Sequence, residues 1–476
     1  MKNWSINYTG LFVALACFAF FRELEAVLPP PDGGYPGNNT AEGQNALFSL
    51  TTGTFNTAVG SLSLKSDMTG SGNTAVGAGT LLANTADQNT AIGVAALLSN
   101  TMGTQNTANG ALALLSNIDG GLNNAYGAFA LFSNTAGGSN TADGAFALFA
   151  NLLGSGNTAI GVNALRKNST GSLNTAVGDG ALSNNTTAGS NVAIGDDALL
   201  NNSTGHENTA NGHLALVANN AGNSNTADGA FALSGNTAGN SNTANGEFAL
   251  SGNTIGNTNT ADGSFALSHN TTGSGNTALG FNAGTGVTTA NNVICIGITG
   301  QNVSDSFYVG NVFQTNIDQD NLPVRIDVTG KLGTQSSSRR FKEDINPMDK
   351  ASEVILALKP VSFRYKNDAK RSPQFGLIAE QVAEIDSTLV SFDKERKPYS
   401  VRYDQVNAML LNEFLKEHRK VQALEKGVIA LTAQLKEQAA QIQKNSAQVE
   451  MHNSRTKIQP VAGVTDLATA EAEDKK

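Results

Sequence analysis

Two consecutive segments, NTADGAFALFANLLGSG at 140–156 and NTAIGVNALRKNSTGSL at 157–173, contain the pattern that decides the fold. Each begins with Asn, and Ala, Gly and Leu follow at offsets of two, four and eight residues. The unit recurs in steps of 17 residues, except for two predicted steps of 16. Strict spacing of this kind predicts a repeat architecture rather than disorder, although the chain contains 51 glycines. The predicted starting asparagines are Asn56, Asn73, Asn89, Asn106, Asn123, Asn140, Asn157, Asn174, Asn191, Asn208, Asn225, Asn242, Asn259, Asn276 and, in a degenerate copy, Asn292.

The repeat unit predicts one coil of a mainly β fold. Offsets two, four and eight have the same parity, so a strand would place Ala, Gly and Leu on one face, often with Phe at offset six. Offset three accepts residues as different as Val76 and Asp143, so it is predicted to be exposed. A turn-rich stretch follows each Leu. Because one unit cannot bury its apolar face alone, we expect stacked units, a parallel β-solenoid or β-roll, over residues 56–300.

Two chemical roles for the repeats are alternatives to an ordinary solvated surface. Asp143, Asp228 and Asp262 share one offset but are separated by a coil or more, so they do not form a metal-ligand cluster. Aligned threonines suggest an ice-binding face, but Thr is also a common strand residue. The threonines concerned are Thr57, Thr74, Thr90 and Thr107.

The charge distribution excludes nucleic-acid binding by the repeats. The formal net charge is −9, and between residues 45 and 300 the basic residues are Lys65, Arg166 and Lys167. Such a surface has no electrostatic means of holding phosphates. The two cysteines, Cys17 and Cys295, form neither a disulfide framework nor a metal-ligand pattern, and no cofactor is expected.

The N-terminus is typical of an export signal over residues 1–26. Lys2 precedes an apolar run at 11–21, and Arg22 follows too soon for a membrane span of about 20 residues. We predict cleavage near Ala26; the ALAC sequence at 14–17 leaves a lipoprotein signal as the alternative. No other segment is predicted to cross a membrane. Residues 27–55 are then a leader and N-terminal cap, and the mature chain is secreted or lies at the cell surface.

The C-terminal third has a different composition. Residues 301–335 alternate apolar and polar side chains and predict a β neck, and 336–403 predict a small α+β domain with a helix starting near Asp349. Residues 404–450 predict a long coiled-coil helix, and 451–476 a disordered tail. One seam of the helix carries apolar residues every seven positions: Phe414, Val421, Val428, Leu435, Ile442 and Val449. The other seam position carries Leu410, Leu424 and Leu431, interrupted by Glu417, Gln438 and Asn445.

Two resemblances extend these predictions. The NTAVG and NTAIG units are similar to the NSVAIG-type repeats in the heads of trimeric autotransporter adhesins, which implies a trimeric left-handed parallel β-roll. That family's repeat is shorter, so the resemblance covers only the strand half of each unit. Residues 336–430 resemble the C-terminal intramolecular chaperone domain of phage tailspikes and tail fibres, also found in a membrane-bound transcription factor of animals. The matching blocks are SSRRFKEDI, LKPVSFRYK, FGLIAEQVAEI and VRYDQVNAMLLNEFLKEH.

The second resemblance implies chemistry at one short stretch. In that family the domain assembles a trimeric β fibre and then cuts itself off, using the Ser and Lys of an S-D-x-R-x-K motif. Here Ser337 is implied as the nucleophile, Lys342 as the base and Arg340 as the motif arginine, while Ser338 stands where the family usually has Asp. A neutral lysine can activate a serine hydroxyl. On the residues alone, the alternative is a loop serine and a solvated lysine.

The sequence therefore predicts a secreted homotrimeric fibre-like protein with a self-cleaving chaperone tail. The second hypothesis is a surface adhesin or structural rod that its tail trimerises without cleavage. A third is a solenoid that binds ice or a cell-surface glycan ligand.

Overall fold

The computed structural model describes residues 35–317, 321–327 and 329–455. It divides into two compact units, with the boundary between Asn316 and Ile317. The predicted signal peptide and residues 456–476 of the predicted disordered tail lie outside the described residues, whereas residues 451–455, also predicted to be disordered, are helical. Within the described ranges, no helix combines the length and apolar character needed to cross a membrane.

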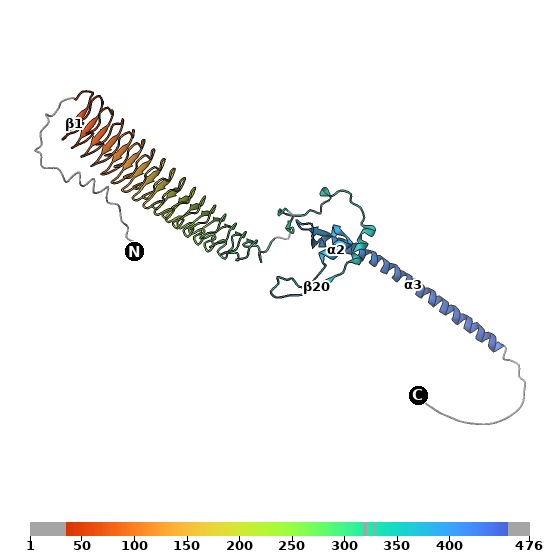
Figure 1. The fold of residues 1–476 in the computed structure, drawn as a ribbon. Helices are drawn as coiled ribbons and strands as arrows, with labels where there is room; N and C mark the ends of the chain where they lie inside the picture. Colours follow the sequence, from red (N-terminus) through yellow and green to blue (C-terminus); the bar gives the residue numbers. More distant parts are fainter. Residues whose placement is uncertain (1–34, 318–320, 328, 456–476) are drawn as a thin grey trace, which may run out of the picture. The chain divides into compact units, whose positions relative to one another are not determined.

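The N-terminal unit is a β-solenoid in which one short strand from each coil joins a single 17-stranded sheet (Figure 1). Each strand pairs in parallel with the next along the chain, so the predicted fold class is confirmed. The strands are β1 (Thr40–Glu42), β2 (Thr57–Val59), β3 (Thr74–Val76), β4 (Thr90–Ile92), β5 (Thr107–Asn109), β6 (Asn124–Tyr126), β7 (Thr141–Asp143), β8 (Thr158–Ile160), β9 (Thr175–Val177), β10 (Val192–Ile194), β11 (Thr209–Asn211), β12 (Thr226–Asp228), β13 (Thr243–Asn245), β14 (Thr260–Asp262), β15 (Thr277–Leu279), β16 (Ile294–Ile296) and β17 (Phe307–Val309).

The predicted Ala and Leu positions do form the core, but the strand is shorter than expected. Ala142 at offset two and Leu148 at offset eight are fully buried. The strand ends at Asp143, however, and Leu148 lies in a turn with φ of 51°. Ala147 at offset seven is also fully buried, which a continued strand would have prevented. The prediction of one extended strand through offset eight was therefore wrong; the core Leu reaches inward from a left-handed turn.

The Gly at offset four is required by the close stacking of coils. Gly144 has φ of 142°, and a Cβ at this position would lie 2.4 Å from the carbonyl oxygen of Gly161 in the next coil. Only glycine accepts this conformation and this approach without strain.

Two ladders of buried asparagines run through the core and were not predicted. The starting asparagine of each coil accepts a backbone hydrogen bond from the next one: Asn157 N–H donates to Asn140 Oδ1 at 3.0 Å. Its own Nδ2 donates to a carbonyl oxygen of the same coil, that of Gly171, at 2.9 Å. A second asparagine lies at offset eleven, where Asn168 Nδ2 donates to Asn151 Oδ1 at 2.8 Å. These ladders satisfy buried polar groups in every coil that contains them.

Asp67 replaces asparagine at the N-terminal end of the offset-eleven ladder and is fully buried. Burial raises the pKa of its carboxyl group, and the charge of Asp87 adds to this effect. Hydrogen bonds from Gly70, Asn84 and Asn73 oppose the increase. The ladder therefore begins at an acid for which the folded core favours the protonated form.

The solenoid extends beyond the predicted limits at both ends. β1 lies inside the segment predicted as leader and cap, and its Thr40 pairs with Thr57 in the same register as every later coil. β17 lies inside the predicted neck and pairs with β16. The degenerate start at Asn292 was wrong by one residue, because Val293 N–H is the group that donates to Asn276 Oδ1. That step is therefore 17 residues long, like its neighbours.

The phenylalanines at offset six do not share the core with Ala and Leu. Phe129 and Phe146 are half-buried on the surface of the coils and stack on each other at 5.1 Å between ring centroids. Phe231, Phe248 and Phe265 form a second stack, with separations of 4.8 and 5.1 Å. These spacings match the distance of about 4.8 Å between neighbouring strands, so each ring covers the next one along the rod.

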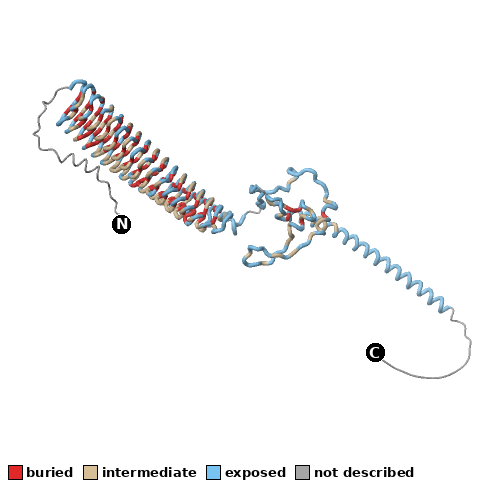
Figure 2. Tube along the Cα trace, viewed as in Figure 1, coloured by how far each residue is buried: buried red, intermediate tan, exposed pale blue. Residues whose placement is uncertain are grey.

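The C-terminal unit is small and mostly exposed, apart from a compact core (Figure 2). Its core consists of Val382, Leu389, Val390 and Val401. Its elements are β18 (Arg325–Ile326), β19 (Leu332–Gly333), η1 (Arg339–Phe341), η2 (Asp349–Ala357), β20 (Val361–Phe363), β21 (Gln374–Gly376), α2 (Ala379–Ile385), η3 (Ser387–Leu389), β22 (Val390–Phe392), β23 (Pro398–Val401) and α3 (Tyr403–Arg455). The helix predicted near Asp349 is present as the 3-10 helix η2 rather than an α-helix. The long C-terminal helix is present as α3, which contains no buried residue.

Candidate functional site

The stretch with the implied catalytic residues forms a short capped turn. Ser338 is the N-cap of η1, and its Oγ accepts from Arg340 N–H at 3.4 Å and from Arg340 Nε at 3.3 Å. Ser336 Oγ accepts from Ser338 N–H at 3.1 Å. Lys342 closes the turn, and its N–H donates to the Arg339 carbonyl oxygen at 3.1 Å. The motif is therefore ordered around Ser338 and Arg340.

The position of Ser338 gives a physical reason why Ser can stand where the resemblance expects Asp. Ser and Asp are both strong N-cap residues, because a side-chain oxygen of either one accepts from an N–H group of the first turn. At this N-cap the local task is to accept from Arg340. Ser338 performs that task, so the substitution preserves the local fold of the motif.

Ser337 precedes the N-cap of this turn and Lys342 is its C-cap, and both residues are exposed. No hydrogen bond joins Ser337 Oγ to Lys342 Nζ in the residues that the structure describes. The single chain thus brings the two residues onto one short segment without forming a nucleophile–base contact. The basic Arg340 lies over the ring of Phe341, with 5.5 Å between its Cζ and the ring centroid.

A second polar cluster joins η2 to α3 and could not be predicted from the sequence. Ser352 is fully buried, and its Oγ donates to Glu413 Oε1. Asn412 Nδ2 donates to Ser352 Oγ at 2.7 Å, and Lys416 Nζ donates to it at 3.3 Å. Lys416 Nζ also donates to Glu413 Oε1 at 2.6 Å. The cluster joins residues about 60 positions apart in the chain.

Charge pairing within this cluster argues against a second Ser–Lys catalytic pair. The hydrogen bond to Glu413 raises the pKa of Lys416, and the charge of Glu353 adds to the increase. The same hydrogen bond lowers the pKa of Glu413. Lys416 therefore stays protonated and cannot act as a base near neutral pH. Its role is to hold η2 against the start of α3.

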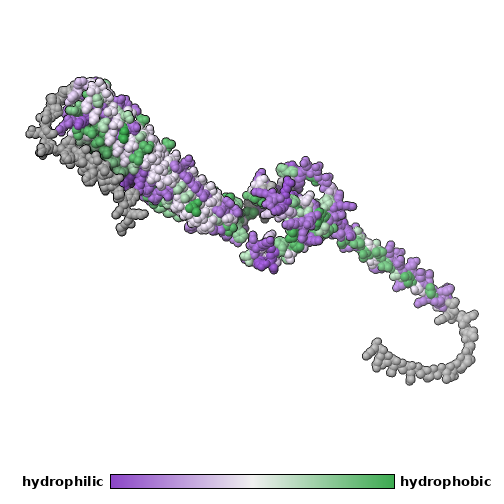
Figure 3. Space-filling model, in the orientation of Figure 1, coloured by the Kyte–Doolittle hydropathy of each residue, from purple (hydrophilic) through white to green (hydrophobic). Residues whose placement is uncertain are grey.

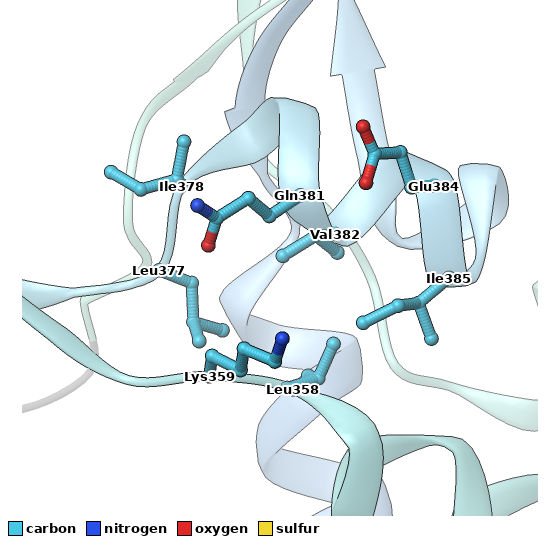
Figure 4. A pocket seen from close by; sticks show the side chains of 8 residues that line it. All are labelled: Leu358, Lys359, Leu377, Ile378, Gln381, Val382, Glu384 and Ile385. Atoms are coloured by element: carbon cyan, nitrogen blue, oxygen red, sulfur yellow. The ribbon is translucent and has the colours of Figure 1, made fainter.

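A hollow of about 240 Å³ lies between the end of η2, the β21–α2 connection and α2 (Figure 4). Its apolar lining comes from Leu358, Leu377, Ile378, Val382 and Ile385. Its polar lining comes from Lys359, Gln381 and Glu384. Neither Ser337 nor Lys342 lines this hollow. The hollow therefore does not contain the residues predicted to carry out cleavage.

The acidic residues of the solenoid do not form a metal site. Asp143, Asp228 and Asp262 each occupy an exposed strand position. In the described part of the chain, no group of three or more His, Cys, Asp or Glu side chains has the geometry to hold a metal ion. Cys295 is buried and free, as expected for a residue in the column that elsewhere carries Ala.

A family comparison bears on the C-terminal unit. Residues 337–391 match the family model described as chaperone of endosialidase. The match begins at Ser337 and ends within β22, so it covers the capped turn, η2 and the small core except Val401. Comparisons with curated proteins and with solved structures gave no match. A chaperone-of-endosialidase domain therefore follows the β-solenoid, as the sequence resemblance predicted.

Proposed function

We propose that this chain is a secreted, homotrimeric fibre protein whose C-terminal unit assembles the solenoid rod and then cuts itself away beside Ser337. The observation that carries the proposal is the order of the parts: a segment that matches the endosialidase-chaperone family follows a long repetitive β-solenoid. Repetitive β structures assemble slowly between chains, because correct contacts must form among many similar ones. A covalently attached chaperone meets that need.

Exposed apolar residues in the C-terminal unit support self-association. Every apolar residue of the α3 seam is exposed; Leu435 and Ile442, for example, are each 64% exposed. Figure 3 shows hydrophobic residues along the length of α3 among hydrophilic ones. Phe375 and Tyr399 outside the helix are 82% and 77% exposed. A helix with this seam is stable when partner helices cover the seam, which supports an oligomer built through α3.

The proposed cleavage is a single-turnover acyl transfer within the chain. Lys342 Nζ, in its neutral form, accepts the proton from Ser337 Oγ as the oxygen attacks the carbonyl carbon of the adjacent scissile peptide bond. The C–N bond breaks, the amine leaves with a proton, and an ester remains on Ser337 until water hydrolyses it. Both side chains are exposed and apart in the single chain. Assembly would therefore have to bury the stretch and bring them together, which would couple cleavage to trimer formation.

Denaturing gel electrophoresis with intact mass spectrometry tests the cleavage. The samples are the wild type, Ser337→Ala, and Ser336→Ala as the matched control one residue away. Two fragments with a junction beside Ser337 are expected for the wild type and for Ser336→Ala, and one uncut chain for Ser337→Ala. An uncut wild-type chain that is trimeric in solution would eliminate the protease and keep the chaperone.

That second outcome corresponds to the alternative function, a surface adhesin or structural rod that α3 trimerises permanently. The observation in its favour is the separation of Ser337 from Lys342 in the single chain, where neither side chain is bound to the other. In that case the repeats would carry the function, and a cell-surface or glycan ligand would be sought on residues 39–309.

A further inference from the structure

The third residue of each solenoid strand forms an outward-facing column along the rod, called column three below. Strand pairing aligns its members one above the other, for example Ile160 with Val177 and Asp228 with Asn245. The column alternates in character. Its apolar segments are Val59, Val76 and Ile92, then Ile160, Val177 and Ile194, then Leu279, Ile296 and Val309. Its polar positions are Glu42 in the first coil, then Asn109, Tyr126 and Asp143, then Asn211, Asp228, Asn245 and Asp262.

The apolar segments of column three are exposed in the single chain, except for the half-buried Val177. Val76 is 37% exposed, and Leu279 is 49% exposed, whereas the alanine before each of them is buried. A row of β-branched and Leu side chains in consecutive coils is a contiguous apolar surface, not a set of isolated residues. Such surfaces on a folded protein mark sites of interaction.

The change between apolar and polar segments is compensated elsewhere in the same coils. Where column three carries Asp228, Asn245 and Asp262, offset six carries the stacked ring series of Phe231, Phe248 and Phe265. Where it carries Ile160 and Val177, offset six carries Asn163 and Gly180. The polar coils therefore keep an apolar group that packs along their own chain, and column three and offset six change character together.

We infer that column three is the contact between copies of this chain, and that its alternating segments fix their axial register; this rests on the proposed homotrimer. A partner for this surface must present apolar segments with the same lengths and spacing over the whole rod. A second copy of the chain, parallel and in register, presents such segments because its sequence is the same. The seam of α3 favours the parallel direction, because it joins the copies at their C-terminal ends.

Register is otherwise poorly specified in this rod. Ala, Gly, Leu and Asn recur at the same offsets in nearly every coil, so a shift by one coil would reproduce most other contacts. On column three, the same shift places an apolar residue against a polar one at each segment boundary, as between Asp143 and Ile160. Polar residues at a few positions of a repetitive interface specify register in the same way in coiled coils.

In the second polar segment of column three, two pairs of side chains already satisfy part of their hydrogen-bonding groups within the chain. Asn211 Nδ2 donates to Asp228 Oδ1 at 3.0 Å, and Asn245 Nδ2 donates to Asp262 Oδ1 at 3.0 Å. Each carboxylate thus already accepts one amide from its own chain. The remaining groups can bind water or the amides of another copy.

A block-exchanged variant of the full chain tests the register. It carries Ile160→Asn, Val177→Asp and Ile194→Asn together with Asn211→Val, Asp228→Ile and Asn245→Val. The introduced residue types, Asn, Asp, Val and Ile, all occur natively in this column, so each coil should still fold. The apolar and polar segments of column three then align between two variant chains, but not between a variant chain and a wild-type chain. When the two chains are co-expressed with different tags, mixed oligomers should be at least about tenfold rarer than random mixing gives.

Cysteine crosslinking locates the contact and its direction. In a Cys17→Ser, Cys295→Ala background, Val76→Cys and Ile296→Cys should each form a disulfide with the same residue of another copy. Thr187→Cys, exposed in the coil of Val177 but on another turn, is the control and should not. Self-links at neither Val76→Cys nor Ile296→Cys in an oligomeric protein would overturn the inference.

The outcomes separate this inference from the proposed function. A monomeric wild type would refute the homotrimer itself. A trimer in which wild type and block-exchanged chains mix at random, or in which column three gives no links, would keep the proposed function and refute the register role of column three.

Discussion

The buried asparagine ladder at offset eleven should be a main source of solenoid stability, and neighbouring residues allow a matched test. Asn185 is buried: its Nδ2 donates to Asn168 Oδ1 at 2.7 Å and to the Ala188 carbonyl oxygen at 2.9 Å. Its Oδ1 accepts from Asn202 Nδ2 at 3.1 Å. Asn184, one residue earlier, lies at the surface, where its Nδ2 donates to Asn201 Oδ1 at 3.0 Å.

Asn185→Ala removes three hydrogen bonds, but the partners are affected differently. The Ala188 oxygen keeps a donor in Asn174 Nδ2, and Asn202 Nδ2 keeps the Gly205 oxygen as an acceptor. Asn168 Oδ1 loses its ladder donor inside the core. With about 1 kcal/mol for a net hydrogen bond and about 1–3 kcal/mol for a buried unpaired acceptor, the expected loss is about 3 kcal/mol. Asn184→Ala should cost less than about 1 kcal/mol, because its bonds are exposed to water.

Hydrogen exchange followed by mass spectrometry on the full-length chain measures this difference coil by coil. Because coils contact only their neighbours, the loss should be concentrated in the coils around Asn185. A loss of about 3 kcal/mol corresponds to amide exchange roughly a hundredfold faster there. Equal acceleration in Asn184→Ala and Asn185→Ala would refute the reasoning, since the ladder would then contribute no more than a surface amide.

Three further predictions concern single residues. Burial raises the pKa of Asp67 above its ordinary value of 3.8, so the contribution of protonated Asp67 to folding stability is present below pH 3.8 and is lost as pH rises through the folded pKa. Asp67→Asn should therefore raise the thermal midpoint at neutral pH but not below pH 3.8. An equal gain at both pH values would contradict the raised pKa. Leu148→Ala should destabilise the solenoid by about 2–5 kcal/mol in denaturant, whereas Leu153→Ala, at a 57% exposed leucine, should change it little. Ser338→Ala should slow any cleavage at Ser337 through loss of the η1 cap, whereas Ser338→Asp should not; equal rates would show that the cap is irrelevant.

The repeat spacing was sufficient to predict the parallel solenoid and most of its core, because the inward positions are nearly invariant. It was insufficient for the path of the backbone. The parity of Ala142 and Leu148 suggested one strand, yet Leu148 reaches the core from a left-handed turn. Parity cannot distinguish these cases, since a turn of suitable length also points its last side chain inward. The predicted start of the last repeat at Asn292 was also wrong. Asn292 has φ of 57° and its side chain donates a hydrogen bond to Asp305, whereas Val293 occupies the ladder position.

The sequence did contain a pattern that indicates the second asparagine ladder. Asn recurs at offset eleven from Asn84 to Asn270, and such constancy in an otherwise variable turn indicates burial. The site in the C-terminal unit offered less. Ser337 and Lys342 came from a family resemblance, and their spacing along the chain says nothing about side-chain contact. The cluster of Ser352 with Glu413 depends on how η2 packs against α3, which no local pattern encodes.

On the proposed function, the placement of the chaperone follows from the difference between contacts within and between chains. Within a chain, each coil pairs with the next, so the rod forms from local contacts that favour fast folding. Between chains, near-identical coils make many wrong registers almost as good as the right one. A unit that joins the chains at one end through α3 limits their relative shift before column three comes into contact. Its later removal takes away no solenoid core residue, because the buried core from Ala41 to Cys295 lies in the N-terminal unit.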